Sequence, residues 1–246
     1  MVSGRVASAP LCGAVFLMRG SRIVVVGRNP TDNGVLICGL GSFGASTAHA
    51  LARMGQRILA IDRDPALVQE WTGRLGRVVE ADSTNAEVLG QLGCDQFGVA
   101  VVAIGTSVES SVLTAANLVD LGIEQIWAKA LSKQHGRILE RIGVHHVVHA
   151  ERDAGLRVAH LVTGRLLDYI EFDDGFAIVK MRPPQETQGF TLAEAHIREK
   201  YGVTIVGVKS PDRDFTYAQP DTRVSQHDVL IVSGRTKLIE KFAARP

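Results

Sequence analysis

The chain reads Val35-Leu-Ile-Cys-Gly39-Leu-Gly41-Ser-Phe-Gly44 where its regular pattern begins, so that a short apolar run leads into a turn of the form G-x-G-x-x-G. In such a turn the first glycine permits a tight bend, the second lets the backbone approach a phosphate, and the third allows close packing of helix against strand. The helix that follows offers unpaired N–H groups and a partial positive charge to an anion. These residues predict a strand, a phosphate-binding turn and a helix. The alternative is that the glycines serve packing alone.

Beyond this turn, apolar runs rich in β-branched residues alternate with segments of helix length. The predicted strands are Val35–Cys38, Ile58–Ile61, Val78–Val79, Val99–Ile104, Ile126–Ala128 and Val147–Val148. The predicted helices are 43–54, 65–74, 85–92, 107–121 and 133–142. Alternation of nearly all-apolar strands with helices is typical of a parallel sheet that is covered on both faces. We therefore predict an α/β fold, with a doubly wound, Rossmann-type domain over residues 34–152.

The pattern changes after residue 152. Residues 153–168 are expected to form one longer helix with apolar residues along one side. Two alternating segments, Tyr169–Phe172 and Phe176–Met181, then flank Asp173-Asp174-Gly175, which is typical of a β-hairpin. The other expected elements are a short helix from Thr191 with Glu194 at capping-box spacing, strands at Val203–Val208 and Val229–Val232, and a last helix from Thr236. Residues 169–246 are thus predicted to form a small α+β domain.

Residues 1–33 lack this regularity and are expected to form an N-terminal arm. Within the arm, Arg22–Gly27 favours a strand. Met18 is an alternative start, which would make residues 1–17 an upstream extension. No apolar stretch of the sequence reaches the roughly 18–20 residues that a membrane helix needs.

The composition excludes several classes of protein. The 27 Lys and Arg residues are balanced by 26 Asp and Glu residues, so the basic surplus of a general nucleic-acid binder is missing. Aromatic residues make up only 5% of the chain, which leaves few platforms for stacking single-stranded bases. Cys12, Cys38 and Cys94 lie far apart and are odd in number. Neither a disulfide framework nor a zinc ribbon is expected, and a cytoplasmic, reducing location is predicted.

Two charged residues support a nucleotide site. Asp62 ends the second predicted strand, 18 residues after Gly44, where a carboxylate can accept hydrogen bonds from both ribose hydroxyls. The negative charge of a 2′-phosphate would be repelled by that carboxylate, which favours adenosine nucleotides and NAD over NADP. Arg63 beside it would instead attract a 2′-phosphate. Lys129 is a lone cation within an apolar strand, and a bound phosphate would be a natural partner for it. The alternative for Lys129 is a strand-end side chain that reaches solvent.

The sequence lacks several common motifs of dehydrogenases, hydrolases, metalloproteases and P-loop NTPases. None of the three tyrosines begins a Y-x-x-x-K pair, and the chain contains no G-x-S-x-G, H-E-x-x-H or G-x-x-x-x-G-K-[ST]. A binding module is therefore favoured over an enzyme. The alternative function is that of a small NAD-dependent oxidoreductase.

A series of segments resembles the RCK (regulator of potassium conductance) family, and in particular the KtrA/TrkA-type cytosolic subunits of bacterial potassium uptake systems. The segments are Gly39–Gly44, Leu59-Ala-Ile-Asp62, Ala81-Asp-Ser-Thr84, Val101-Val-Ala-Ile-Gly105, Ile126-Trp-Ala-Lys-Ala130, Leu139-Glu-Arg-Ile-Gly143 and His149-Ala-Glu-Arg-Asp153. The resemblance extends from about Val35 to the C-terminus. It implies a Rossmann lobe that binds ATP, ADP or NAD(H), followed by an RCK C-terminal (TrkA-C) domain.

The resemblance also implies roles for individual residues. The implied nucleotide-binding residues are Gly39, Gly41, Ser42, Phe43 and Gly44 at the phosphates, Asp62 and Arg63 at the ribose, Asp82 and Ser83 at the adenine, Ala103, Ile104 and Gly105 beside the nucleoside, and Lys129, Ala130 and His135 on the phosphate side. Glu151 matches an acidic residue that joins a Mg²⁺ or other cation site near the phosphates at the dimer interface. Relatives commonly carry an arginine where this chain has Ser42, and a serine supplies no positive charge to a terminal phosphate.

The same resemblance implies partners. The helix over 153–168 would pair two protomers, and the dimers would assemble into an octameric ring on the inner face of the membrane beneath a separate potassium-translocating pore subunit. In the C-terminal domain, Leu192, Glu194, Arg198 and Val203–Val206 partly match the positions where some relatives bind cyclic di-AMP. Nucleic acid is not an expected partner.

Overall fold

The computed structural model describes residues 14–19, 22–27, 33–172 and 174–245. The chain divides into two compact units, Met1–Ala150 and Glu151–Pro246. Among the described residues, no helix has both the length and the apolar character that crossing a membrane would require.

The first unit contains the predicted parallel sheet. Its six strands lie in the order β5-β4-β3-β6-β7-β8, and every neighbouring pair is parallel. The strands are β3 (Val35–Cys38), β4 (Ile58–Asp62), β5 (Arg77–Glu80), β6 (Val99–Val102), β7 (Gln125–Lys129) and β8 (His146–Val148). The chain leaves β3 in one direction across the sheet for β4 and β5 and returns for β6, β7 and β8. This reversal is the topological switch point of a doubly wound sheet, where ligands bind.

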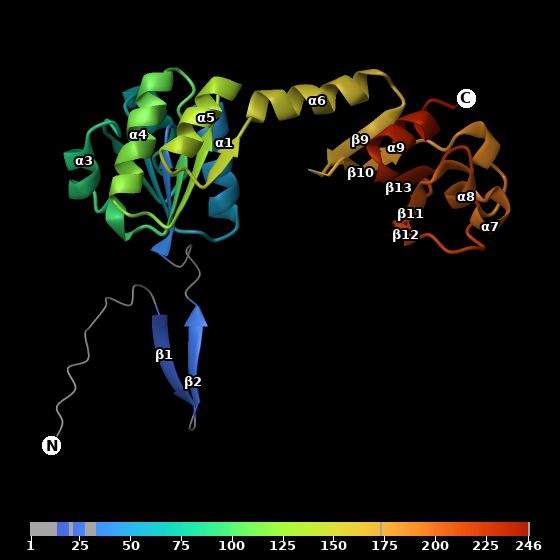
Figure 1. Ribbon diagram of the computed structural model, residues 1–246, viewed down its shortest axis with the longest axis horizontal. Coiled ribbons are helices and arrows are strands. Elements are labelled where there is room, and N and C mark those ends of the chain that lie inside the picture. The colour runs from blue at the N-terminus through green and yellow to red at the C-terminus, as the bar shows by residue number, and fades with distance from the viewer. Residues whose placement is uncertain (1–13, 20–21, 28–32, 173, 246) are drawn as a thin grey trace. The chain divides into compact units, whose positions relative to one another are not determined.

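Helices cover both faces of this sheet (Figure 1). They are α1 (Ser42–Arg53), α2 (Pro65–Trp71), α3 (Ala86–Gln91), α4 (Val108–Asp120) and α5 (Lys133–Arg141), with a 3-10 turn at Cys94–Gln96. Alternate residues of β3 enter different cores, because successive side chains of a strand point to opposite faces. Val35 and Ile37 pack in the cluster that includes Ala48 of α1, whereas Leu36 packs in the cluster that includes Leu118 of α4. The predicted Rossmann-type fold is confirmed.

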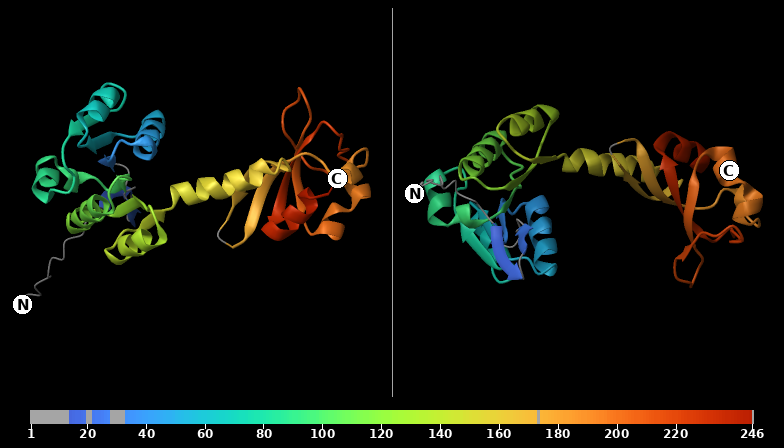
Figure 2. Two further views of the ribbon diagram at one scale, coloured as in Figure 1. Left: turned by 90° about the horizontal axis from the view of Figure 1, so that it is seen from above. Right: turned by 60° about the horizontal axis from the view of Figure 1, so that its bottom comes forward.

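The second unit is built on an antiparallel sheet (Figure 2). Its five strands lie in the order β12-β11-β13-β10-β9. They are β9 (Leu166–Glu171), β10 (Phe176–Met181), β11 (Thr204–Lys209), β12 (Thr216–Tyr217) and β13 (Val229–Arg235). The helices are α6 (Ala150–Val162), which begins at the boundary, α7 (Leu192–Ala195), α8 (Ile197–Tyr201) and α9 (Thr236–Ala243), with a 3-10 turn at Gln185–Thr187. The β9–β10 hairpin and the Thr191–Glu194 capping box are confirmed.

The predicted helix over residues 153–168 is wrong at its C-terminal end. The structure ends α6 at Val162 and begins β9 at Leu166. Gly164 has φ +71°, and its N–H donates to the carbonyl of Leu161, so the chain turns out of the helix there. Leu166 is then buried in the core of the second unit rather than extending a helical face.

The N-terminal region contains a two-stranded antiparallel pair, β1 (Ala14–Arg19) and β2 (Arg22–Gly27). The predicted strand at Arg22–Gly27 is confirmed. Its partner strand was not predicted, and the rest of the expected arm lies outside the described residues.

Candidate nucleotide site

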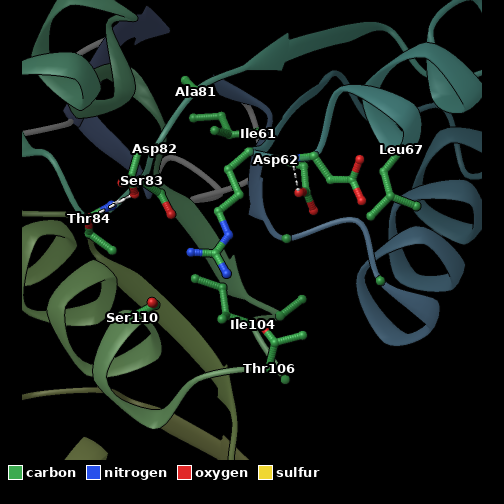
Figure 3. Close-up of a pocket in the computed structure, with 16 residues that line it drawn as sticks. Ile61, Asp62, Leu67, Ala81, Asp82, Ser83, Thr84, Ile104, Thr106 and Ser110 are labelled. Carbon is green, nitrogen blue, oxygen red and sulfur yellow. Dashed lines mark hydrogen bonds between the residues drawn. The ribbon is translucent and has the colours of Figure 1, made fainter.

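A cavity of about 220 Å³ opens at the carboxyl ends of β3, β4, β5 and β6. Figure 3 shows side chains from β4, from the loop after β5 and from the loop after β6 around it. The lining residues are Gly39, Gly41, Ile61, Asp62, Arg63, Asp64, Leu67, Ala81, Asp82, Ser83, Thr84, Ala103, Ile104, Gly105, Thr106 and Ser110. The cavity therefore lies at the switch point of the sheet.

The three glycines of the turn have different environments. Gly39 has φ +102°, and a Cβ there would lie 3.1 Å from the carbonyl carbon of Ala103. A Cβ on Gly44 would overlap the carbonyl oxygen of Gly39. Gly41 has no atom within 4 Å of its Cβ position, and it is the N-cap of α1 with no side-chain cap. Gly39 and Gly44 thus serve close packing, while Gly41 leaves open space in front of the N-terminus of α1.

Asp62 is held in place at the end of β4. Its Oδ2 accepts a hydrogen bond from the Leu40 N–H at 2.6 Å, and its Oδ1 accepts one from the Asp64 N–H at 2.9 Å. Each carboxylate oxygen can accept more than one hydrogen bond, so capacity for a ligand remains. The carboxylate is therefore preorganised to receive hydroxyl donors in the cavity.

Asp82 lies in the loop that follows β5. Its Oδ1 accepts hydrogen bonds from the Thr84 N–H at 2.9 Å and from the Thr84 hydroxyl at 2.8 Å (Figure 3). The backbone hydrogen bond from Thr84 lowers the pKa of Asp82, and the Thr84 hydroxyl and the nearby Arg63 guanidinium act in the same direction. Asp82 is therefore ionised at neutral pH, and the cavity carries a second carboxylate beside Asp62.

The segment after β6 forms another wall. The predicted strand Val99–Ile104 is too long, because β6 ends at Val102. The Ala103 N–H still donates to the Cys38 carbonyl at 2.7 Å, after which Ile104 and Gly105 leave the sheet and line the cavity. The strand prediction extended into the residues that form the wall.

Lys129 approaches the cavity from the end of β7. Its Nζ lies 3.2 Å from the Cβ position of Gly105, which lines the cavity, and 5.9 Å from the centre of the Phe43 ring. The amine is thus close to the wall without lining the cavity itself. Its expected role on the phosphate side stays a prediction.

The structure brings together only some of the residues implied by the resemblance. Those that line the cavity are Gly39, Gly41, Asp62, Arg63, Asp82, Ser83, Ala103, Ile104 and Gly105. Ser42, Phe43 and Gly44 form the first turn of α1, while Lys129 and Ala130 lie at and just after the end of β7.

His135 is buried in α5 and does not line the cavity. Its Nδ1 accepts a hydrogen bond from the Leu131 N–H at 3.2 Å. Burial lowers the pKa of His135, and the nearby His149 lowers it further. The imidazole is therefore a neutral acceptor that fixes the turn before α5.

Several lining residues were missed. They are Ile61, Asp64, Leu67, Ala81, Thr84, Thr106 and Ser110. The rule that ligands bind beyond the carboxyl ends of parallel strands could have indicated Thr84 and Thr106, which lie in the loops that follow β5 and β6. Leu67 and Ser110 lie on helices, and only the packing of those helices brings them to the cavity.

The cation position implied for Glu151 lies in the first turn of α6. Within the described parts of the chain, no group of three or more His, Cys, Asp or Glu side chains is arranged to hold a metal ion. Mg²⁺ commonly binds through one or two carboxylates together with phosphates and water. The cation role of Glu151 stays a prediction.

Comparison with known proteins identifies the family. The TrkA-N domain matches residues 35–150. The Ktr system potassium uptake protein C of Bacillus subtilis is 36% identical over 210 residues, which are 85% of this chain and 95% of that protein. This chain belongs to the Ktr potassium uptake protein family. Ktr system potassium uptake protein A of the same organism is 31% identical over 84% of this chain and 93% of its own length.

Solved structures support the fold. The RCK domain of GsuK matches with a TM-score of 0.61 at 20% identity, over 86% of this chain. The matched part is 48% of that RCK chain, so this chain corresponds to about half of it. A GsuK channel bound to NAD matches with the same TM-score and identity. These structures confirm the fold, while the TrkA-N match and the Ktr relatives confirm the resemblance to KtrA/TrkA-type proteins.

Proposed function

We propose that this protein is a nucleotide-sensing regulatory subunit of a potassium uptake system. The observation that carries the proposal is the cavity at the switch point of the sheet. The glycine turn, the hydrogen-bonded Asp62 carboxylate and the wall formed by residues 81–84 meet there. Family membership supplies the potassium uptake context. Residues 34–152 form the nucleotide-binding domain in this proposal, and residues 169–246 form the TrkA-C domain.

The cavity suits an adenosine nucleotide without a 2′-phosphate, namely ATP, ADP or NAD(H). Asp62 accepts hydrogen bonds from the ribose hydroxyls, and its negative charge opposes a phosphate at the 2′ position. The diphosphate lies against the N-terminus of α1, where Gly41 leaves room and the helix dipole attracts an anion. Lys129 adds a cation at that side, whereas Ser42 contributes only a hydroxyl group.

The proposed mechanism is binding without turnover. A ligand shifts a conformational equilibrium only by its different affinities for the two states, and each tenfold difference contributes about 1.4 kcal/mol. Several sites on one ring can therefore bias a pore strongly even when each discriminates weakly. The partner is a separate membrane pore subunit that translocates potassium, and the protein is cytoplasmic and peripheral to the inner face of the membrane.

The ring requires contacts between protomers. Helix α6 has no buried residue, and its Leu156, Val158 and Val162 side chains are 52%, 53% and 75% exposed. Apolar side chains exposed on one helix favour association with another apolar surface. A second copy of this chain is the proposed occupant, and four such dimers would form the octameric ring.

A cation would join this interface. In the proposal, the Glu151 carboxylate would hold Mg²⁺ or another cation near the nucleotide phosphates. When bound, the cation would neutralise phosphate charge and make nucleotide affinity depend on the cation concentration. Replacement of Glu151 by Gln should remove the Mg²⁺ dependence of ATP binding, and an unchanged dependence would refute this assignment.

The second unit offers the positions proposed for cyclic di-AMP. Arg198 and Val206 are exposed, while the carboxylate of Glu194 accepts hydrogen bonds from the backbone and hydroxyl of Thr191 in the capping box. Glu194 therefore already has a structural role, and Arg198 is the residue left to contact a phosphate. Titration of the wild-type chain and an Arg198→Ala variant with cyclic di-AMP tests this part separately.

The main test is calorimetric titration of nucleotide-free protein with ATP, ADP and NADH, each with and without Mg²⁺. An Asp62→Ala variant provides the control for binding in the cavity. The proposal is supported if the wild-type chain binds a nucleotide and Asp62→Ala abolishes that binding. It is refuted if the wild-type chain binds none of the three nucleotides. Steady oxidation of NADH with a carbonyl substrate would instead favour the oxidoreductase alternative.

A further inference from the structure

We propose that Thr114 and Asn117 of α4 are positioning residues, which fix the cavity wall formed by residues 81–84 and thereby set the preference of the site for the nucleotide base. This inference rests on the proposed nucleotide site. Neither residue lines the cavity. Each acts instead through the loop that follows β5.

The contacts run from α4 to the loop. The Asn117 side-chain amide donates to the carbonyl of Thr84 at 2.8 Å and lies 3.4 Å from the carbonyl of Ser83. The hydroxyl groups of Ser83 and Thr114 are hydrogen-bonded at 2.9 Å. Two consecutive residues of the wall are thus tied to one face of α4, three positions apart on the helix.

The burial of these groups gives the contacts their strength. Thr114 is fully buried and Ser83 is 7% exposed, so both hydroxyl groups are largely removed from water. Removing one partner of a buried hydrogen bond leaves the other unsatisfied, and such a loss is more costly than the loss of an exposed bond. The wall is therefore held in one conformation before a ligand arrives. Binding then loses little conformational entropy, because folding has already ordered residues 81–84.

The held conformation determines what the wall offers to a base. The Asp82 carboxylate lines the cavity as an ionised acceptor, and it cannot donate a hydrogen bond. Adenine carries an amino group that donates to such an acceptor. Hypoxanthine carries a carbonyl oxygen at the same position, which would be repelled. A wall fixed by α4 should therefore prefer ADP to inosine diphosphate (IDP), which differs from ADP only on that edge of the base.

The experiment measures this preference by calorimetric titration of the full chain with ADP and with IDP. Asn117→Leu removes the amide donor at similar side-chain size, and Thr114→Val removes the hydroxyl group from a nearly isosteric side chain. We expect each variant to bind ADP about five- to tenfold more weakly, which is the scale of one lost hydrogen bond. The affinity for IDP should change much less, so the ADP-to-IDP ratio should fall.

A matched control separates positioning from general destabilisation. Ser132 caps α5 by accepting a hydrogen bond from the His135 N–H, and it does not line the cavity. Ser132→Ala should lower the melting temperature while keeping the ADP-to-IDP ratio of the wild type. The inference is overturned if both α4 variants keep that ratio, or if Ser132→Ala loses it equally. If the wild-type chain binds neither nucleotide, the proposed function itself is wrong.

Discussion

A methyl group added at Gly44 should destabilise the first unit, whereas one added at Gly41 should leave it folded and impair nucleotide binding. The Cβ of Gly44→Ala would overlap the carbonyl oxygen of Gly39 and lie 2.8 Å from the Cβ of Ala103. The N–H of the same peptide unit, that of Leu40, donates to the Asp62 carboxylate, so this peptide cannot move away without loss of a hydrogen bond. Overpacking costs about 1–3 kcal/mol or more, and the gain in helix propensity returns only about 1 kcal/mol.

The expected net loss for Gly44→Ala is about 2 kcal/mol, which corresponds to a fall in melting temperature of roughly 8 °C. Gly41→Ala meets no atom within 4 Å, and the φ of −61° at Gly41 suits alanine, so its cost should stay below about 1 kcal/mol. Its methyl group would nevertheless occupy the space proposed for the phosphates. We expect ADP affinity to fall about tenfold or more, equivalent to about 1.4 kcal/mol.

Thermal unfolding of both variants and calorimetric titration with ADP provide the assay. Each variant controls for the other, because the two substitutions are chemically identical and lie three positions apart in one turn. A Gly44→Ala protein that melts within about 2 °C of the wild type, which is the scatter expected for a neutral surface change, would refute the packing argument. A Gly41→Ala protein that binds ADP like the wild type would refute the phosphate position.

Three further substitutions test other parts of the site. Asp62→Asn should weaken ADP binding about tenfold, because an amide has one acceptor oxygen where the carboxylate has two. It should also reduce discrimination against NADP, because the amide is uncharged. If NADP competes with ADP no better in the variant than in the wild type, this reasoning is contradicted. Lys129→Met should weaken binding of ADP more than that of adenosine, since only ADP carries phosphates, and equal losses in calorimetry would argue against a phosphate contact. His135 has a lowered pKa in the folded chain, so the unfolded chain takes up the proton first as the pH falls below about 6.5, and stability is lost towards the folded pKa. His135→Asn should flatten this loss in urea unfolding between pH 7.5 and 5.5, and an unaltered slope would show that other groups cause it.

The regular parts of the first unit were predictable because a parallel sheet is buried on both faces. Its strands then read as apolar runs between helical segments, and β3 and β4 follow that pattern closely. The boundary between α6 and β9 was predicted incorrectly, because Leu166 also fits a helical spacing. Gly164 carried the only local signal for the turn, and a single glycine does not distinguish a helix end from a tolerated helix interior.

By itself, the sequence determined which functional groups follow one another along the chain: a glycine turn after β3, a carboxylate at the end of β4 and a polar loop after β5. These features depend on neighbours in sequence, and the spacing of Gly44 and Asp62 was enough to indicate a nucleotide site. Only the tertiary structure decided that Thr114 and Asn117 support the wall at 81–84. Their contacts join residues about thirty positions apart in the chain and arise from the packing of α4 against the sheet. The sequence pattern of α4 alone does not indicate which loop the helix contacts.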